Sequence, residues 1–178
     1  MKNSRLVPQF AGILLLIMSL IGSWPVFQVE AAGQHAHHKL RVEIPEILKM
    51  EMGSGEITFD LTRANPEEPY PAPTYPFYYT PTSTEKYIPV RVFSNGRKEW
   101  RLLISGVSEQ GLAEGAIEWS LDGTNWQPLR VTEQILTTGG YTNGWQELKV
   151  YFRLVLFGPE HAGPGQYKVQ VNYQLSSV

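Results

Sequence analysis

The last part of the chain shows the clearest alternation of apolar and polar side chains. Over residues 167–175, tyrosine, valine and leucine occupy every second position, with lysine, glutamine and asparagine between them. A period of two with one apolar face is typical of a half-buried antiparallel strand. A second alternating run spans residues 148–156, and Gly163-Pro164-Gly165 supplies a turn between the two runs. We therefore predict a β-hairpin at this end of the chain.

Shorter runs of the same kind predict further strands, and no segment of ten or more residues shows the 3.6-residue period of a helix. Asn95-Gly96, which lies between two apolar runs, favours a second hairpin. About eight short strands with frequent turns predict an all-β fold, an antiparallel β-sandwich of immunoglobulin-like or Greek-key type. The other predicted strands span residues 40–44, 56–62, 87–93, 100–105, 117–121 and 129–136.

Residues 66–81 interrupt this pattern with six prolines in 16 residues. Proline lacks a backbone donor and biases its neighbours towards extended conformations, so this segment is predicted to be a long loop and not a central strand. Its aromatic rings either pack over the open end or edge of the sandwich or form an extended surface that binds a ligand. These rings belong to Tyr70, Tyr75, Phe77, Tyr78 and Tyr79.

The N-terminal 31 residues have the pattern of a secretory signal peptide. Lys2 and Arg5 precede an apolar stretch at residues 10–21, and small residues suited to cleavage follow, which places the mature N-terminus at Ala32. The alternative is an uncleaved anchor, since a generous count of the apolar stretch reaches spanning length. After cleavage we expect a flexible, histidine-containing segment at residues 32–39, a single domain at residues 40–178, and no further contact with the membrane.

Composition limits the partners and the source of stability. Without the signal peptide the chain has 13 basic and 16 acidic residues and no basic cluster, which argues against a nucleic-acid partner. It contains no cysteine, so an exported domain of this size must be stabilised by its core, by strand pairing or by assembly. Export without cysteine is common among envelope proteins of Gram-positive bacteria.

The residues that carry enzyme chemistry are sparse. His35, His37 and His38 form a cluster of metal-ligand type close to the mature N-terminus, but no second set of ligands completes a site. His161 has no recognisable nucleophile near it in the sequence, and the chain has no Gly-x-Ser-x-Gly motif. The oxygens around Asp122 are explained by a tight turn better than by calcium binding. We therefore expect a protein that is not an enzyme and has no metal or cofactor.

The order of the predicted strands resembles the WxL domain of Gram-positive cell-surface proteins. An early strand at residues 57–60 and a strand at residues 88–94 precede a Trp-x-Leu motif, Trp100-Arg101-Leu102, and the last strand closes the domain at residues 165–175. The second motif has Tyr173 where the family has tryptophan, and similar closing strands occur in other immunoglobulin-like surface modules. The resemblance implies non-covalent attachment to peptidoglycan.

Three functions follow as hypotheses. The first is an envelope protein that binds peptidoglycan or another envelope polysaccharide through surface aromatics, for which the candidates are Trp100, Trp145, Tyr141 and Tyr173. The second is a structural subunit of a surface fibre or spore layer, in which residues 40–50 add as a strand to a neighbouring copy or another surface protein. The third, and the weakest, is an extracellular hydrolase, because no catalytic constellation can be assembled.

Overall fold

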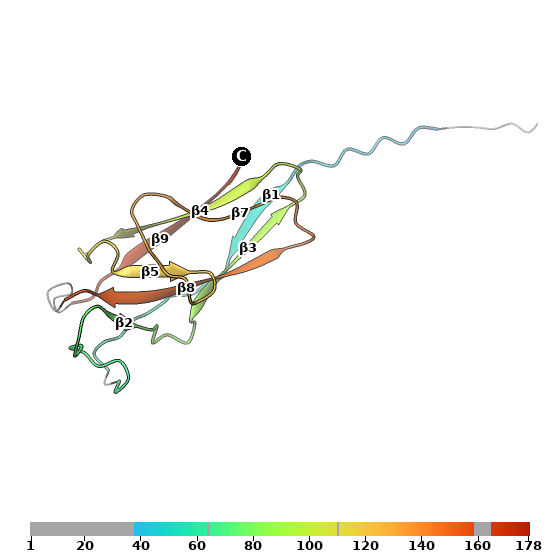
Figure 1. Ribbon diagram of the computed structural model, residues 1–178. Coiled ribbons are helices and arrows are strands. Elements are labelled where there is room, and N and C mark those ends of the chain that lie inside the picture. The colour runs from blue at the N-terminus through green and yellow to red at the C-terminus, as the bar shows by residue number, and fades with distance from the viewer. Residues whose placement is uncertain (1–37, 64, 110, 159–164) are drawn as a thin grey trace, which may run out of the picture. The chain divides into compact units, whose positions relative to one another are not determined.

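The computed structural model describes residues 38–63, 65–109, 111–158 and 165–178. Across these residues the chain forms nine strands in two antiparallel sheets and no helix, which confirms the predicted all-β sandwich (Figure 1). All nine strands belong to one compact unit, Glu43–Val178. In the other unit, Met1–Val42, the structure describes residues 38–42, which form no strand.

Several sequence predictions lie outside the described residues. They are the signal peptide at residues 1–31, most of the segment at residues 32–39, and the histidines His35, His37 and His161. Within the part that is described, no helix is long and apolar enough to cross a membrane.

The larger sheet is built around one long strand, β8, because its eleven residues are long enough to pair with different strands along their length. On one side β8 pairs with β3 and then with the short β2, and on the other side with β5. β1 extends the sheet beyond β3, and β6 extends it beyond β5. The six strands are β1 (Leu48–Met52), β2 (Phe77–Tyr79), β3 (Tyr87–Ser94), β5 (Ile117–Ser120), β6 (Gln127–Pro128) and β8 (Gln146–Leu156).

The smaller sheet has three strands in the order β7, β4, β9. Its central strand, β4 (Trp100–Ser108), pairs with β9 (Val169–Ser177) over nine residues in one unbroken register. On its other side β4 pairs with β7 (Gln134–Gly139), where the register shifts between Leu102 and Leu103.

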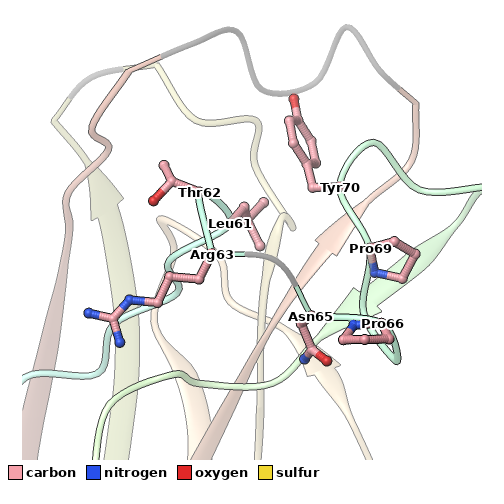
Figure 2. Close-up of a pocket in the computed structure, with 7 residues that line it drawn as sticks. All are labelled: Leu61, Thr62, Arg63, Asn65, Pro66, Pro69 and Tyr70. Carbon is pink, nitrogen blue, oxygen red and sulfur yellow. The ribbon is translucent and has the colours of Figure 1, made fainter.

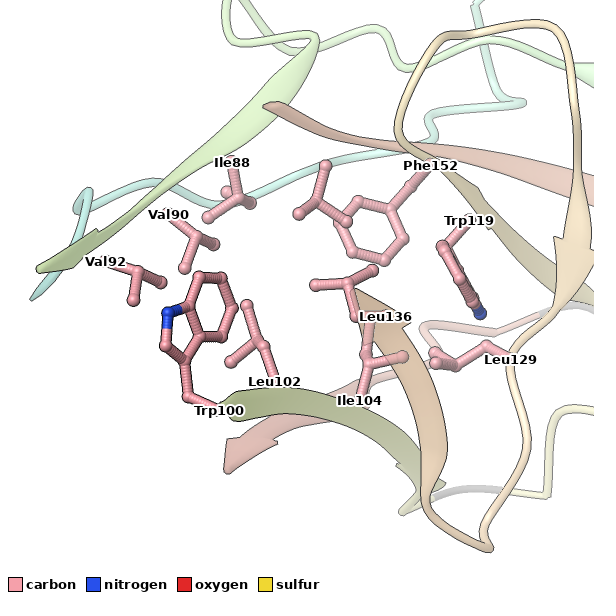
Figure 3. Packing of buried hydrophobic residues seen from close by; sticks show 11 residues of the cluster. Ile88, Val90, Val92, Trp100, Leu102, Ile104, Trp119, Leu129, Leu136 and Phe152 are labelled. Carbon is pink, nitrogen blue, oxygen red and sulfur yellow. The ribbon is translucent and has the colours of Figure 1, made fainter. Parts of the chain in front are cut away.

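The core lies between the two sheets and is built from every second residue of the facing strands (Figure 3). Trp100 is its largest buried side chain, and the indole nitrogen Nε1 donates a hydrogen bond of 2.6 Å to the carbonyl oxygen of Gly140. Both apolar residues of the Trp100-Arg101-Leu102 motif are therefore core residues. The buried members of this cluster are Ile88, Val90, Val92, Trp100, Leu102, Ile104, Trp119, Leu129, Leu136, Val150 and Phe152.

Both predicted hairpins are wrong, because each pair of strands is split between the two sheets. β3 and β4 flank Asn95-Gly96 but lie in different sheets, and so do β8 and β9. The Asn95 side chain binds the chain before β1 instead: Oδ1 accepts a bond of 2.6 Å from the Ile47 amide, and Nδ2 donates one of 3.0 Å to the Pro45 carbonyl.

The predicted strands at residues 40–44 and 56–62 are also wrong, since neither segment forms a strand. Thr58 and Asp60 are tied to Thr82 and Ser83 mainly by side-chain hydrogen bonds, which do not make a regular ladder. The strand predicted at residues 129–136 begins at Gln134, because Leu129 lies between strands with its side chain in the core.

Candidate functional site

Of the four predicted sugar-contact residues, Trp100 is not available at the surface and Tyr173 is half-buried. Trp100 is buried in the core, and the Tyr173 hydroxyl is buried with no hydrogen-bond partner among the described residues. Burial raises the pKa of Tyr173 well above its ordinary value. Both were placed at the surface wrongly, because they lie on the inward-facing positions of β4 and β9. Trp145 and Tyr141 are exposed, with 36% and 70% of their surface accessible.

The Pro- and Tyr-rich segment does not present its five rings as one surface. Tyr79 is buried against Leu154 and Leu156 of β8, and its hydroxyl donates a bond of 3.1 Å to the Pro69 carbonyl. The Tyr75 hydroxyl is buried, and Phe77 packs on the same cluster. This half of the segment therefore has a structural role, because β2 extends the sheet beside β8. The two exposed rings are Tyr70 and Tyr78.

A pocket of about 400 Å³ opens beside this segment (Figure 2). The Asp60 carboxylate lies 2.9 Å from the Nε atom of Arg63, and hydrogen bonds from Thr62, together with that cation, lower the pKa of Asp60. Within the described ranges, no group of three or more His, Cys, Asp or Glu side chains is arranged to hold a metal ion. The described residues that line this pocket are Leu61, Thr62, Arg63, Asn65, Pro66, Pro69 and Tyr70.

The outer surface of the larger sheet carries a row of half-exposed aromatic rings. Because side chains alternate between the two faces of a strand, Val90 and Val150 point into the core, and the odd-numbered residues of β3 and those of β8 up to Arg153 point outwards. Tyr87 and Tyr151 are directly opposite each other on this outer side, with ring centroids 5.4 Å apart. The ammonium group of Lys149 lies 4.8 Å from the Tyr87 ring centroid.

At one end of this row Trp145 and Phe93 form a second aromatic pair, with ring centroids 5.7 Å apart. The Arg91 guanidinium carbon lies 5.1 Å from the centroid of the Trp145 ring. The same guanidinium forms an ion pair of 3.2 Å with Glu51 of β1. Trp145 therefore contacts both an aromatic ring and a paired cation of β3.

At the other end Arg153 packs against two further rings. Its guanidinium carbon lies 4.1 Å from the Tyr78 ring centroid and 4.5 Å from the Trp126 ring centroid. Both Nε and Nη2 of Arg153 lie 2.6 Å from Oε2 of Glu118, which is directly opposite on β5. Charge-assisted bonds of this length orient the guanidinium, so it fixes the positions of both rings.

We call these six rings, which belong to Tyr78, Tyr87, Phe93, Trp126, Trp145 and Tyr151, the aromatic face. The aromatic face extends along β8 from the Trp145 end, where Gln146 pairs with Val92, to the Tyr78 end, where Val155 pairs with Tyr78. These positions are nine residues apart along the strand, or roughly 30 Å. Aromatic rings combine a flat apolar surface with polar edges, which suits ligands that have both kinds of surface. The face can therefore take an extended ligand with flat apolar patches and polar groups between them.

Of this face, sequence reasoning identified Trp145 and Tyr78 and missed the other four rings. The signal was present: Tyr87, Phe93 and Tyr151 occupy the positions between the buried residues of their strands, where a solvated sheet usually has polar side chains. Trp126 has no such signal, because only the fold brings it to Arg153.

Comparisons with known proteins identify no family for the chain: no protein-family model, no curated protein and no solved structure matches it significantly. The aromatic face therefore has to be interpreted from its own chemistry.

Proposed function

We propose that this protein is an exported, non-catalytic envelope protein that binds cell-wall polysaccharide non-covalently through the aromatic face. Export follows from the signal-peptide pattern of residues 1–31. The resemblance to WxL domains and the absence of cysteine from the sequence point to the wall of a Gram-positive bacterium. Peptidoglycan is the first ligand to test, and other envelope polysaccharides come next.

The observation that carries the proposal is the row of six rings along the outside of the sheet. A sugar ring presents a face of C–H groups that packs on an aromatic ring, while its hydroxyl groups seek charged and polar partners at the rim. Large exposed apolar groups on a soluble sheet mark a binding surface, because they cost free energy in water. A linear glycan can contact several rings in succession along β8.

The charges on this face favour a sugar over a nucleic acid. Arg91 is paired with Glu51, and Arg153 is paired with Glu118, so neither cation is free to neutralise a phosphate. The mature chain also carries more acidic than basic residues. Catalysis is not part of the proposal, because the sequence offers no nucleophile with a base beside it.

The test is retention of the mature chain, residues 32–178, on purified protein-free cell walls. We compare the wild type with Trp145→Ala and Tyr151→Ala, which remove one ring from the end and one from the middle of the face. A lost aromatic contact that contributes about 1.4 kcal/mol weakens binding about tenfold, and we expect a loss of this size from each variant. Digestion of the wall with a muramidase should release the bound wild-type protein.

Tyr141→Ala is the matched control, because Tyr141 is the most exposed of the aromatic side chains predicted to bind sugar and has no ring contact with the aromatic face among the described residues. It should bind like the wild type. An equal loss of wall binding in all three variants would show that exposed aromatic rings adsorb non-specifically, without a defined site. Undiminished binding of Trp145→Ala and Tyr151→Ala would refute the proposal.

A further inference from the structure

β9 is the one long edge strand that carries none of the usual protection against pairing with another chain. It bonds to β4 on one side, and within the described residues no strand pairs with its other side. Its nine residues include no proline and no charged side chain. Natural edge strands are usually blunted by charges, prolines, bulges or short length, because free backbone N–H and C=O groups invite pairing.

The other edges of the two sheets do carry such protection. β1 presents Lys49 and Glu51, β6 has two residues and includes a proline, and β2 has three residues with prolines close on both sides. β7 is shorter than β9, and its pairing with β4 contains a register shift. β9 is therefore the edge at which strand addition meets the least resistance.

The inner side of β9 is also incompletely covered. Val169, Val171, Tyr173 and Leu175 all pack against the main core, yet all four are half-buried, whereas Leu102 and Ile104 on the neighbouring β4 are fully buried. The reason is that β9 ends its sheet: among the described strands only β4 pairs with it, and β1 of the larger sheet approaches it at a few positions. A strand added to this edge would extend the core if it carried apolar residues at every second position.

The same chain contains a segment with that pattern. Residues 40–44 read Leu-Arg-Val-Glu-Ile, and the three apolar side chains Leu40, Val42 and Ile44 are 85%, 78% and 78% exposed. Such alternation is typical of a strand with one buried face, but here that face has no cover. Apolar side chains exposed in this way are stabilised by burial against an apolar partner.

The linker that follows this segment is bound to the unit that holds the nine strands. β1 starts at Leu48, opposite Ser94 at the end of β3. Asn95 holds the linker Pro45-Glu46-Ile47 through the Pro45 carbonyl and the Ile47 amide. We propose that residues 40–44 of one copy add as a strand to the β9 edge of a second copy, so that copies join head to tail. Such a heterologous contact is unsaturated at both ends and builds rings or filaments.

This inference is independent of polysaccharide binding, because the aromatic face belongs to the other sheet. It is tested first by sedimentation velocity of the mature chain over a wide range of concentration. We expect oligomers that grow with concentration, and Val42→Asp should return the protein to a monomer. Val131→Asp is the matched control, since Val131 is 58% exposed in a loop between β6 and β7, and it should assemble like the wild type.

Disulfide trapping gives the second test, and the cysteine-free sequence provides a clean background. Copies with Glu43→Cys are mixed with copies carrying Gln170→Cys, Asn172→Cys or Gln174→Cys, which share the polar side of the expected ladder. One of the three pairs should form a mixed dimer on oxidation at least about tenfold faster than Val131→Cys with the same partner, since cross-linking requires Cβ atoms within about 4.5 Å. A wild type that stays monomeric at every concentration, or mixed dimers no faster than the control, would overturn the proposal.

Discussion

Two neighbouring glycines, Gly139 and Gly140, offer a sharp test of how Trp100 is packed. Neither has a positive φ, so alanine is compatible with the backbone at both positions. A Cβ atom at Gly139 would overlap the six-membered ring of Trp100, whereas a Cβ atom at Gly140 would meet no atom within 4 Å. The Trp100 ring cannot move aside, because it is buried and its Nε1 is bound to the Gly140 carbonyl.

Gly139→Ala should therefore destabilise the fold by about 1–3 kcal/mol, the usual cost of overpacking a core. Gly140→Ala should be neutral or stabilise by about 0.4–1 kcal/mol, because alanine restricts the unfolded chain. Urea unfolding measures both. With an m-value of about 2 kcal/mol per M, the midpoint of Gly139→Ala should fall by about 1 M.

The comparison between the two variants is decisive, since they differ by one position in the chain. A shift in intrinsic tryptophan fluorescence should accompany the loss of stability in Gly139→Ala alone. Equal midpoints for both variants would show that Trp100 does not pack on Gly139 as the structure has it.

Three further predictions concern single side chains. Tyr173→Phe removes a buried hydroxyl that has no hydrogen-bond partner in the part of the chain that the structure describes, so stability at pH 7 should hold or rise by about 1 kcal/mol. Because burial raises the pKa of Tyr173 above its ordinary 10.0, the unfolded chain loses the phenol proton first as the pH rises, and the stability of the wild type should fall above pH 10. If the urea midpoints of Tyr173→Phe fall as steeply over this pH range, the Tyr173 side chain is not buried as described. Hydrogen bonds from Asn125 and Thr124 lower the pKa of Asp122 below 3.8. The contribution of ionised Asp122 to the free energy of unfolding is therefore present above that pH and is lost as the pH falls through the folded pKa. Asp122→Asn should flatten the acid side of the curve of stability against pH, and an unchanged slope would contradict this. Asn95→Ala deletes the two side-chain hydrogen bonds to the chain before β1 and should lower the free energy of unfolding by about 1–3 kcal/mol. Amide hydrogen exchange in β1 should become faster. Unchanged exchange would show that β1 is held by β3 alone.

The strands with one apolar face towards the core could be predicted from the sequence. β3, β4, β8 and β9 all have apolar residues at every second position, because each lies between a core and solvent. What the pattern could not decide was which strands pair. Asn95-Gly96 has the residues of a tight hairpin, yet its asparagine side chain is used to bind Pro45 and Ile47, and the chain crosses to the other sheet.

The first residue of β1 could not be predicted from the alternation of apolar and polar residues either. Residues 40–44 and Leu48–Met52 alternate equally well, and they are separated by Pro45-Glu46-Ile47. Only the second of these segments pairs with β3, because the contacts of Asn95 fix where the ladder begins. Local alternation carries no information about such a partner 48 residues away.

The candidate site was predicted in kind but only partly in its residues. Exposed aromatics were expected, and Trp145 and Tyr78 are on the aromatic face. Trp100 was misplaced, and for Tyr79 the sequence left packing and a binding surface open. A large aromatic side chain at an alternating position fits the core as well as the surface, and the sequence does not say which side faces inwards. The strand register decides this, and it also brings Tyr87 opposite Tyr151.

The four tryptophans of residues 32–178 allow the most direct test of polysaccharide binding. Trp126 and Trp145 belong to the aromatic face, whereas Trp100 and Trp119 are buried in the core. Indole N–H resonances of ¹⁵N-labelled protein are followed while soluble peptidoglycan fragments are added. The account predicts saturable shifts of the Trp126 and Trp145 signals with the other two unmoved. No shift at saturating fragment, or shifts confined to Trp100 and Trp119, would contradict it.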